Sequence, residues 1–143
     1  MSKPFQVYIL AAGCAFYEGA CESLIVPTIQ GQYGILAGHS NMIAAVVPGI
    51  LQYKIPGQPA RTAAVSAGLV KAEGGEVLVL VDTAERPEDI DENRAKRAAD
   101  EAKEEILQKK SIQEYRAAQA SLARAINRLR VKQGNFSGNN IDI

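Results

Sequence analysis

The period of the apolar residues changes near Arg86, and this change constrains the fold more than any other feature of the sequence. Before it, short β-branched and aliphatic runs are interrupted by Gly and Pro, which is typical of strands joined by tight turns. After it, apolar residues recur at steps of three and four, which is typical of helices. Charge changes at the same place, because residues 1–85 hold four Lys or Arg and six Asp or Glu, whereas residues 86–132 hold twelve and nine. The chain therefore divides into a β part and a helical part.

Residues 1–86 predict an antiparallel β-sandwich or flattened barrel of about ten short strands. The clearest apolar runs are Phe5–Leu10, Leu24–Val26, Met42–Val47 and Ile50–Ile55. Two further strands, 69–72 and 77–81, are joined by Glu73-Gly74-Gly75-Glu76, whose glycines supply the positive φ angles of a two-residue turn. We therefore expect a single core between the inner faces of the strands.

Residues 87–132 predict two antiparallel helices paired as a hairpin. Pro87 and the acidic residues after it suit the positive end of a helix dipole, so the first helix should span about 87–108. Lys109 and Lys110 follow its end, and Ser111 with Glu114 forms a capping box that starts the second helix at Ile112. The expected apolar seam of the second helix is Ile112, Tyr115, Gln119, Leu122, Ile126 and Leu129.

Alanine dominates the helical part, with nine alanines between positions 95 and 125. An alanine buries far less apolar surface than a leucine, at ~25 cal/mol for each Å² removed from water. We expect the hairpin to be held loosely, with docked and released arrangements that differ by only a few kcal/mol. Residues 133–143, rich in Gly and Asn, are expected to form a flexible tail without a function.

Composition narrows the classes of function. The C-terminal part of the second helix is basic, which could suggest nucleic-acid binding. Sixteen basic residues balance sixteen acidic ones in the whole chain, however, and no aromatic residues are interleaved with the arginines of this helix. We therefore disfavour a nucleic-acid-binding function. No apolar run reaches the ~18 residues of a membrane span, and no charged leader opens the chain, so we expect a soluble, unexported protein. Cys14 and Cys21 are separated by six residues, which fits no close metal or redox spacing, and we expect both to be reduced.

The sequence offers no catalytic centre. It has no GxxxxGK[ST] loop to hold the phosphates of a self-sufficient ATPase. Ser66 lacks the first glycine of a GxSxG elbow, since position 64 is alanine. His39, the only histidine, stands in a Gly-rich turn, and we assign it no catalytic role. We therefore expect a non-enzymatic protein with no catalytic residue and no bound metal.

Three segments carry a resemblance to a known family. They are Gly31-Gln32-Tyr33-Gly34-Ile35-Leu36-Ala37-Gly38-His39, Val65-Ser66-Ala67-Gly68-Leu69-Val70 and Val81-Asp82-Thr83-Ala84-Glu85-Arg86. In the order and spacing of these segments, the chain resembles the epsilon subunit of rotary F-type ATP synthases of the bacterial type, from about Phe5 to Lys132. The resemblance implies a ten-stranded sandwich followed by a helical hairpin, in agreement with the periodicity.

The resemblance also implies partners and a function. The sandwich would clasp the gamma subunit and rest on the ring of c subunits, as a peripheral part of the complex on the cytoplasmic side of the bacterial plasma membrane. The subunit would couple proton-driven rotation to ATP synthesis, and its hairpin would extend toward the alpha and beta catalytic subunits to restrain ATP hydrolysis. The alternative is a purely structural coupling subunit with a permanently docked hairpin and no inhibitory or nucleotide-sensing role.

A nucleotide site follows from the same resemblance. Some bacterial members bind ATP through an Ile-Asp-x-x-Arg-Ala segment and two arginines of the second helix. The matching residues here are Ile90, Asp91, Arg94, Ala95, Arg124 and Arg128. ATP bound there would be a regulatory signal, and no cofactor would be required. Two features weigh against the site, because Glu101 replaces a further arginine of the strong binders and Asp91 can instead pair locally with Arg94.

Candidate partner contacts complete the expectations. The resemblance places Gly31, Gln32 and Tyr33 toward the c ring, where several relatives have a glutamate in place of Gln32, and His39, a further candidate contact, ends the same matching segment. It also places the basic second helix, with Arg116 and Arg130 as candidate contacts, near an acidic segment of the beta subunit. The alternatives are that the glycines only form turns and that the arginines only line a solvated helix face.

Overall fold

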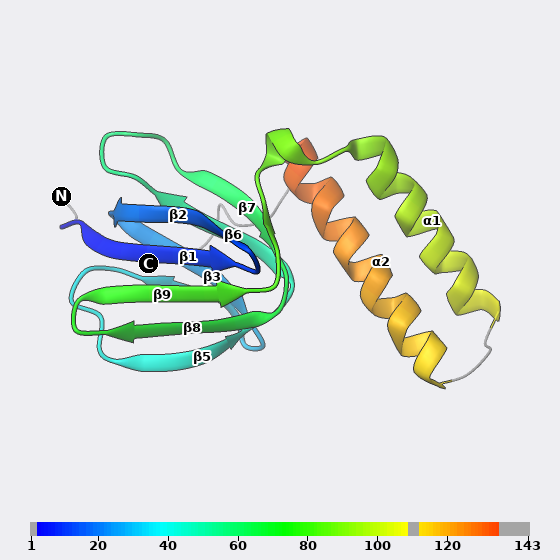
Figure 1. Cartoon of the computed structure of the whole chain (residues 1–143), viewed down its shortest axis with the longest axis horizontal. Coiled ribbons are helices and arrows are strands. Elements are labelled where there is room, and N and C mark those ends of the chain that lie inside the picture. The colour runs from blue at the N-terminus through cyan, green and yellow to red at the C-terminus, as the bar shows by residue number, and fades with distance from the viewer. Residues whose placement is uncertain (1–2, 109–111, 135–143) are drawn as a thin grey trace.

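The computed structural model describes residues 3–108 and 112–134, and it has the two parts that the periodicity predicts (Figure 1). A β-sandwich is followed by two helices, so the predicted fold class is confirmed. The predicted capping box at Ser111 lies outside the described residues, as does the predicted tail from residue 135 onward.

Ten strands form the N-terminal part, which confirms the expected number. Their bounds are β1 (Phe5–Ala11), β2 (Cys14–Cys21), β3 (Ser23–Thr28), β4 (Gly31–Ile35), β5 (Met42–Val46), β6 (Gly49–Lys54), β7 (Arg61–Val65), β8 (Gly68–Glu73), β9 (Glu76–Val81) and β10 (Ala84–Glu85).

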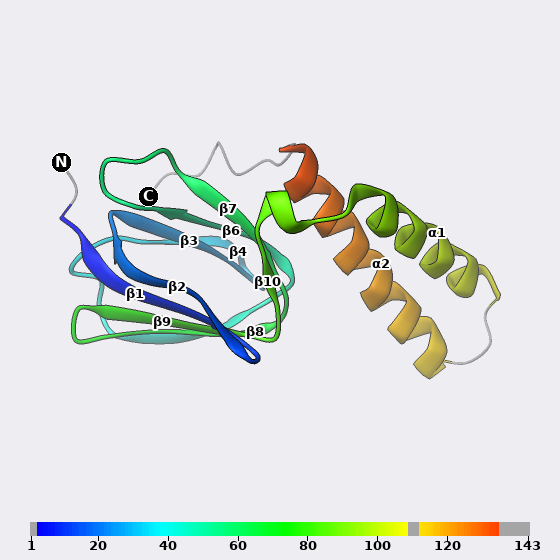
Figure 2. The ribbon, with the colours of Figure 1, turned by 45° about the horizontal axis from the view of Figure 1, so that its top comes forward.

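The strands pair in the order β10-β7-β6-β3-β5-β8-β9-β1-β2, with β4 added beside β3. A single pairing, Thr28 with Val46, joins the β10-β7-β6-β3-β4 half of this path to the β5-β8-β9-β1-β2 half, and the two halves face each other as layers (Figure 2). The expectation of a wholly antiparallel sandwich needs one correction, because β1 and β9 run parallel. Strands so far apart in sequence need no tight turn between them, so they are free to pair in parallel.

The Gly74-Gly75 turn between β8 and β9 is confirmed. Its two glycines have φ angles of 61° and 81°, and Glu73 pairs with Glu76 directly across it. Gly68, at the start of β8, is required for a different reason, because a Cβ there would lie 1.8 Å from the carbonyl oxygen of Leu80. This close approach lets β8 and β9 meet at the end of the sandwich that faces the helices.

One apolar core fills the space between the layers. Alternate residues of β1 point into it, so that Val7 and Ile9 are fully buried, and β9 contributes Val79 in the same way. Leu24 and Leu51 face them from the other layer and are also fully buried. Each side chain of this size contributes about 1.5–3 kcal/mol on burial, so the core holds the two layers together.

The helical part begins later than predicted. Residues Pro87–Asp89 form a short 3₁₀ turn, η1, and α1 spans Glu92–Gln108. The predicted helix from 87 is broken because Ile90 is extended, with φ −90° and ψ 125°. Its side chain enters a small apolar cluster with Ile50, Ala64 and Val131. Burial of Ile90 therefore overrides the helix signal at its start.

Helix α2 spans Ile112–Gln133 and packs antiparallel to α1, as predicted (Figure 1). The predicted seam is wrong in detail, because Ile112 is 73% exposed and Tyr115 is 38% exposed. The buried contacts are mostly alanines, namely Ala95, Ala99 and Ala102 on α1 and Ala118 and Ala125 on α2. Small side chains let two helices approach closely, so the stripe that carries alanine faces the partner helix and the larger residues lie at its margin.

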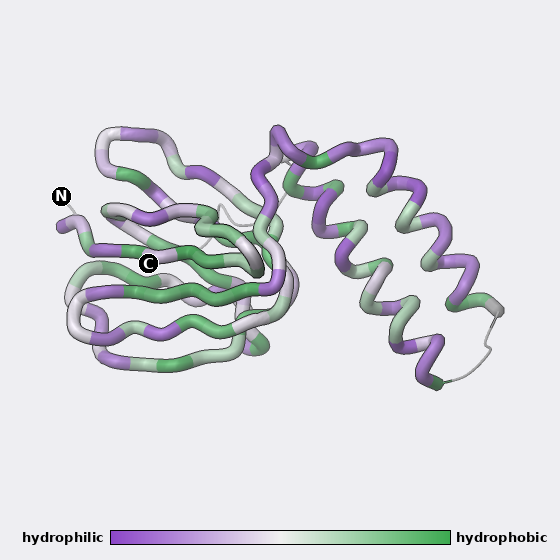
Figure 3. The backbone as a smooth tube through the Cα atoms, viewed as in Figure 1, coloured by the Kyte–Doolittle hydropathy of each residue, from purple (hydrophilic) through white to green (hydrophobic). Residues whose placement is uncertain are grey.

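Within the described residues, the hairpin packs against the sandwich at its root, where the start of α1 and the end of α2 meet. Helix α2 contacts β6, β7 and η1, whereas the rest of the hairpin leans away from the β layers (Figures 1 and 2). The hydropathy colouring shows the same contrast, with apolar segments concentrated in the strands and polar ones over most of the helices (Figure 3). The free end of the hairpin carries exposed apolar residues, including Leu107 at 77% exposure.

Candidate functional site at the root of the hairpin

A cleft of about 370 Å³ lies where the sandwich, η1 and both helices meet. This volume falls within the range of about 300–1,000 Å³ that is usual for small-molecule sites. The residues that line the cleft are Glu85, Asp89, Ile90, Asp91, Arg94, Ala95, Ala98 and Arg128. Five of the six residues predicted for nucleotide binding are thus brought together by the fold.

Arg124 is the sixth predicted residue, and it lies elsewhere. It borders a much smaller neighbouring hollow of about 10 Å³ beside Ser66 and Thr83, and its guanidinium donates to Ser121 Oγ at 3.1 Å. Arg128 lies between the two hollows and lines both. Of the two second-helix arginines predicted for nucleotide binding, Arg128 alone therefore faces the larger cleft in this arrangement.

Asp91 has a structural role in this arrangement. Its carboxylate accepts a hydrogen bond from the backbone N–H of Arg94 at 3.1 Å, and its carbonyl accepts one from the N–H of Ala95 at 3.0 Å. These are the bonds of an N-cap at the start of α1. The contact that we expected as a local Asp91–Arg94 side-chain pair is thus a bond to the backbone of Arg94.

Two apolar residues of the segment form the floor of the cleft. Ile90 is 4% exposed and packs against the end of α2, and Ala95 is 3% exposed beneath the facing helix. Both residues therefore shape the cleft and hold the root of the hairpin together. The Ile-Asp-x-x-Arg-Ala pattern has a folding role whether or not a ligand binds.

An ion pair crosses the boundary between the two parts of the molecule. The guanidinium Nε of Arg128 on α2 donates to Glu85 Oε1 on β10 at 2.7 Å, and both side chains are about one-third exposed. One residue earlier, Asn127 Nδ2 donates to the carbonyl oxygen of Gly49 at 2.8 Å. A Cβ at position 49 would lie 2.7 Å from Pro27 Cβ, so glycine keeps β6 close to β3 at this point.

The charges around the cleft are mixed. Glu85, Asp89 and Asp91 contribute three carboxylates, whereas Arg94 and Arg128 contribute two guanidinium groups. Arg128 is paired with Glu85, and the guanidinium of Arg94 has no ion-pair partner within residues 3–108 and 112–134. Arg94 is therefore the cation most accessible to an anionic ligand.

The residues predicted to face the c ring lie on and next to β4. Gly31, Gln32 and Tyr33 are exposed on this strand, which among the described strands pairs with β3 alone. The Tyr33 hydroxyl lies 2.9 Å from His39 Nε2, and His39 Nδ1 lies 2.7 Å from the carbonyl oxygen of Ser40. Because a carbonyl oxygen only accepts, Nδ1 carries a proton, and in the neutral ring Nε2 accepts from Tyr33. His39 thus orders the loop after β4.

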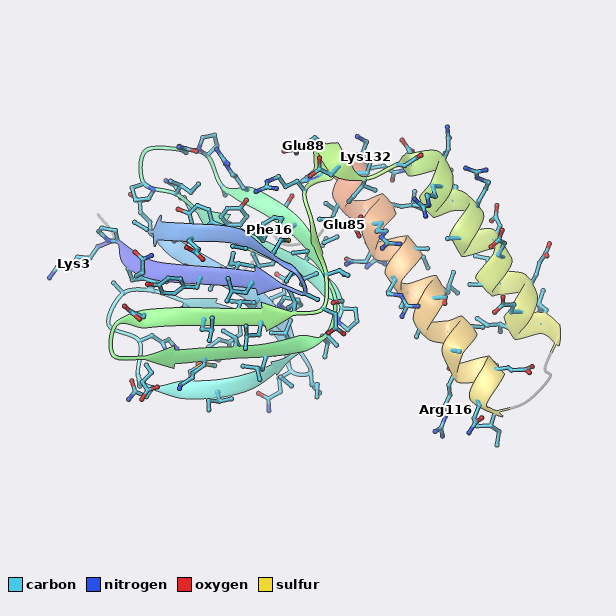
Figure 4. All side chains as sticks on the ribbon, in the orientation of Figure 1. Lys3, Phe16, Glu85, Glu88, Arg116 and Lys132 are labelled. Carbon is cyan, nitrogen blue, oxygen red and sulfur yellow. The ribbon has the colours of Figure 1, made fainter. Side chains whose placement is uncertain are left out.

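The basic residues of α2 do not form one patch. Arg116 lies near the free end of the hairpin, whereas Lys132 lies at its root (Figure 4). Arg130 is exposed close to Lys132, and the step of 14 positions from Arg116 to Arg130 corresponds to about 21 Å along a helix. A partner that bound both arginines would have to lie along most of α2.

A surface that sequence reasoning missed lies on the outer face of the β5-β8-β9-β1 layer. Ala45, Leu69, Leu80 and Leu10 are consecutive register partners across these four strands. Leu69 is 39% exposed and Leu80 is 38% exposed, and Ile43 on β5 is 71% exposed. The sequence signal was present in β9, which is apolar on both faces, a pattern of strands that are covered on two sides.

The remaining motif residues join loops of the sandwich. Ser66 Oγ accepts from the N–H of Thr83 at 2.8 Å, so this hydroxyl serves a loop contact. Arg86 donates to the carbonyl oxygen of Phe16 at 2.9 Å and stacks over its ring at 4.5 Å, which fixes the chain before η1. Cys14 and Cys21 are free thiols, as predicted.

Residues 3–108 and 112–134 contain neither a metal-binding cluster nor a membrane-spanning helix. No group of three or more His, Cys, Asp or Glu side chains there is arranged to hold a metal ion. Neither α1 nor α2 combines the length and the apolar character that crossing a membrane requires.

Family comparisons match nearly the whole chain. Residues 4–87 match the beta-sandwich domain of the ATP synthase delta/epsilon chain, and residues 88–133 match its long alpha-helix domain. The ATP synthase epsilon chain of Caldanaerobacter subterraneus subsp. tengcongensis is 42% identical over 132 residues, which cover 92% of this chain and 95% of the relative. The ATP synthase epsilon chain of Thioalkalivibrio sulfidiphilus is 36% identical over 132 residues, covering 92% and 94%.

Solved structures share the fold. A chain of the Euglena gracilis mitochondrial ATP synthase, solved by cryo-EM as OSCP/F1/c-ring, aligns with a TM-score of 0.78 at 20% identity, covering 87% of this chain and 78% of that chain. A chain of the Tetrahymena thermophila mitochondrial ATP synthase, from a structure of the central stalk and c-ring, aligns with a TM-score of 0.61 at 9% identity, covering 92% and 98%. At these identities the likeness concerns the fold alone.

Proposed function

This chain belongs to the ATP synthase delta/epsilon family, as a non-catalytic epsilon chain of the bacterial type, and from that membership we propose that it is a central-stalk subunit that couples proton-driven rotation to ATP synthesis. We further propose that its hairpin restrains ATP hydrolysis when it leaves the sandwich. The subunit acts at the cytoplasmic side of the bacterial plasma membrane as a peripheral part of the complex.

One observation supports the regulatory part of this proposal most strongly, namely the small contact between hairpin and sandwich. The apolar part of that contact is the cluster of Ile50, Ala64, Ile90 and Val131. Its cross-boundary polar part, within the described residues, is Glu85–Arg128 and Gly49–Asn127. A contact of this size is compatible with a docked state only a few kcal/mol below a released one, which a binding partner can reverse.

The sandwich offers a surface for the gamma subunit. The apolar row Ala45-Leu69-Leu80-Leu10, together with Ile43, covers the outside of one layer. Exposed apolar surface of this kind marks protein interfaces more often than free surface. We assign it to gamma, and we assign the exposed Gly31-Gln32-Tyr33 strand to the c ring, with His39 holding its loop in place.

The extended hairpin meets the alpha and beta catalytic subunits in this proposal. Its exposed cations, Arg116 and Arg130, would face an acidic segment of beta, and exposed charges of this kind mainly guide association and register. Their separation by about 21 Å favours a partner that runs alongside α2 over one that grips a single end.

The cleft at the root is the proposed site for regulatory ATP. Ile90 and Ala95 offer an apolar floor for a base, and Arg94 and Arg128 offer cations for phosphates. Arg124 could join them by a change of rotamer, since it lies one helical turn from Arg128. Bound ATP would act as a signal of energy status, without being consumed.

A structural alternative is favoured by one observation, the ion pair and hydrogen bond that fix α2 to β10 and β6. If these contacts persist in the assembled complex, the subunit couples gamma to the c ring and the hairpin has no inhibitory role.

Reconstitution separates these functions. The complex is assembled with the full-length protein or with a version that ends at Arg86, and ATP hydrolysis is measured at low and high ATP. The regulatory proposal predicts faster hydrolysis with the truncated version, and a larger difference at low ATP. Equal rates at both concentrations would leave only the coupling role, and a failure of both versions to support ATP synthesis would contradict coupling itself.

A further inference from the structure

A second large hollow, of about 390 Å³, lies where the loop between β6 and β7 meets the segment that leaves the sandwich. It shares no lining residue with the cleft at the root of the hairpin, and none of the described residues of α1 or α2 borders it. Tyr53 lies beside four polar or charged lining residues, namely Arg61, Thr62, Arg86 and Glu88. The hollow is thus formed by the sandwich and η1.

Uncharged groups hold the guanidinium of Arg86 at one side of this hollow. Its Nη2 donates to the carbonyl oxygen of Phe16 at 2.9 Å, and its Cζ lies 4.5 Å from the centroid of the Phe16 ring. The carboxylate of Asp89 lies 4.0 Å from Arg86 Nη1 and is largely exposed, so it neutralises the guanidinium weakly. The carbonyl oxygen and the ring therefore fix the position of Arg86 without cancelling its charge.

Arg61, the first residue of β7, is held in a similar way. Its Nη2 donates to Gln58 Oε1, an uncharged amide oxygen, at 2.6 Å. Within residues 3–108 and 112–134, no carboxylate lies within ion-pairing distance of Arg61. Glu88, exposed on η1 (Figure 4), is the one carboxylate among the described lining residues. The hollow therefore has two guanidinium groups and a single carboxylate.

Two guanidinium groups in this arrangement favour an anionic ligand. Arginine offers planar pairs of N–H donors that match two oxygens of a phosphate or a carboxylate. Because Arg61 and Arg86 are already held by other groups, less side-chain entropy is lost when a ligand binds. The polar lining favours a compact hydrophilic ion over an apolar molecule.

We propose that this hollow binds a compact oxyanion of the inorganic phosphate class, held between Arg61 and Arg86. The bound ion joins the first residue of β7 to the residue just before η1, where the chain leaves the sandwich. Glu88 lowers the affinity, because its carboxylate repels an anion in the same hollow. This site goes beyond the proposed function, since it requires neither a partner subunit nor the nucleotide cleft.

Titration of the full-length protein with inorganic phosphate tests the proposal, followed by NMR of the arginine Nε–H and backbone N–H signals. Sodium chloride at matched ionic strength is the reference, because it screens charges equally. We expect saturable shifts at Arg61, Thr62 and Arg86 that chloride does not reproduce. Arg61→Gln should weaken phosphate binding about tenfold or more, because it removes a charge-assisted hydrogen bond to the ligand.

Two substitutions on α1 are the matched controls, because Arg97 and Glu104 are exposed and lie outside the hollow. Arg97→Gln should leave the affinity within about twofold, because a distant exposed charge is largely screened. Glu88→Gln should tighten binding about two- to fivefold by removing a repulsive charge, whereas Glu104→Gln should not. Equal changes in the hollow variants and in these controls would reduce the effect to net charge and overturn the proposal.

The remaining outcomes are also decisive. Arg61 is exposed, and its substitution leaves the bond from Arg86 to Phe16 in place, so we expect Arg61→Gln to keep its fold by circular dichroism. If it does not, Arg61→Lys takes its place, which keeps the charge, loses the planar fork and should bind phosphate several-fold more weakly. Shifts that grow linearly without saturation, or an unchanged affinity in the folded Arg61 variant, would overturn the proposal. Saturable shifts confined to Arg94 and Arg128 would place the anion in the root cleft and overturn it as well.

Discussion

The sandwich and the hairpin differ in the size of the side chains that they bury. Of the eleven largest fully buried side chains, ten lie in the sandwich and one, Val131, lies in α2. The helices bury alanines instead. Alanine has the highest intrinsic helix propensity, so these helices depend less on tertiary packing than the strands do. A segment built this way keeps its secondary structure while it changes partners, whereas the strands are stable only together.

The largest effect should come from the sandwich core. Leu51→Ala removes a fully buried side chain of β6, and we expect it to lower the free energy of unfolding by about 2–5 kcal/mol, because it loses apolar burial and leaves a cavity. Urea unfolding followed by fluorescence of the tyrosines would measure this. Leu107→Ala, at a position 77% exposed in α1, should change the same quantity by less than ~0.5 kcal/mol. Similar effects at both positions would erase the contrast between the two parts.

A substitution in the hairpin tests whether the helices can be destabilised without affecting the sandwich. Ala118 is fully buried between the helices, and Ala118→Leu should overpack the contact and cost about 1–3 kcal/mol of local stability. Helical amides should then exchange faster while strand amides keep their protection. Ala117→Leu adds the same side chain at an exposed position and should leave both sets unchanged. Loss of strand protection in Ala118→Leu would mean that the two parts unfold as one unit.

Ionisation of Cys21 provides a test confined to the sandwich. Burial raises the pKa of its thiol from 9.0 to about 11. The folded state therefore keeps a proton that the unfolded state loses, so the stability contributed by the thiol is complete below about pH 9 and is lost as the pH rises toward about 11. The loss should be up to about 2 kcal/mol.

The measurement for Cys21 is the free energy of unfolding at pH 8 and pH 10.5. The free energy of unfolding of Cys21→Ala should fall less between these two pH values than that of the unmodified protein. Cys14→Ala is the control, since Cys14 is exposed on the same strand and its removal should leave the slope unchanged. Equal slopes in all three proteins would show that Cys21 is not shielded from water.

The smallest effect should come from the boundary between the two parts. Asn127→Ala removes the bond to the carbonyl oxygen of Gly49 and should weaken docking of the hairpin by about 0.5–1.5 kcal/mol. A distance probe between the sandwich and the free end of α2 should report a larger released population. Gln119→Ala, which removes only a bond to Tyr115 within α2, should leave that population unchanged. An unaltered population in Asn127→Ala would indicate that the root does not depend on this bond.

Periodicity was sufficient to predict both parts, the number of strands and the Gly74-Gly75 turn. These features are set by local rules, since alternation defines a buried face and positive φ angles need glycine. The parallel pairing of β1 with β9 was not predictable, because no local signal specifies which distant strands become neighbours. The break at Ile90 was missed for a related reason, because its burial against Val131 is a tertiary contact that outweighs helix propensity.

The resemblance pointed to residues that the fold brings together in one cleft, but it did not indicate their arrangement. The motif and the second-helix arginines together supplied five of the residues that line the cleft, while the position of Arg124 outside it and the pairing of Arg128 with Glu85 depend on how α2 meets β10. The sequence did not indicate which charges are already compensated. The apolar row on the outer face of the sandwich did have a sequence signal, the two-sided apolar pattern of β9, although this pattern alone does not specify what covers the outer face.

Native-state hydrogen exchange of the full-length protein tests the central claim most directly, because it measures the opening free energy of each part in one experiment. The account predicts that amides of α1 and α2 exchange through local openings several kcal/mol below those of β1 and β9. It also predicts that low concentrations of urea hardly change the opening free energies of the helical amides. Protection in the helices equal to that in the strands, with and without ATP, would contradict a hairpin that can change partners.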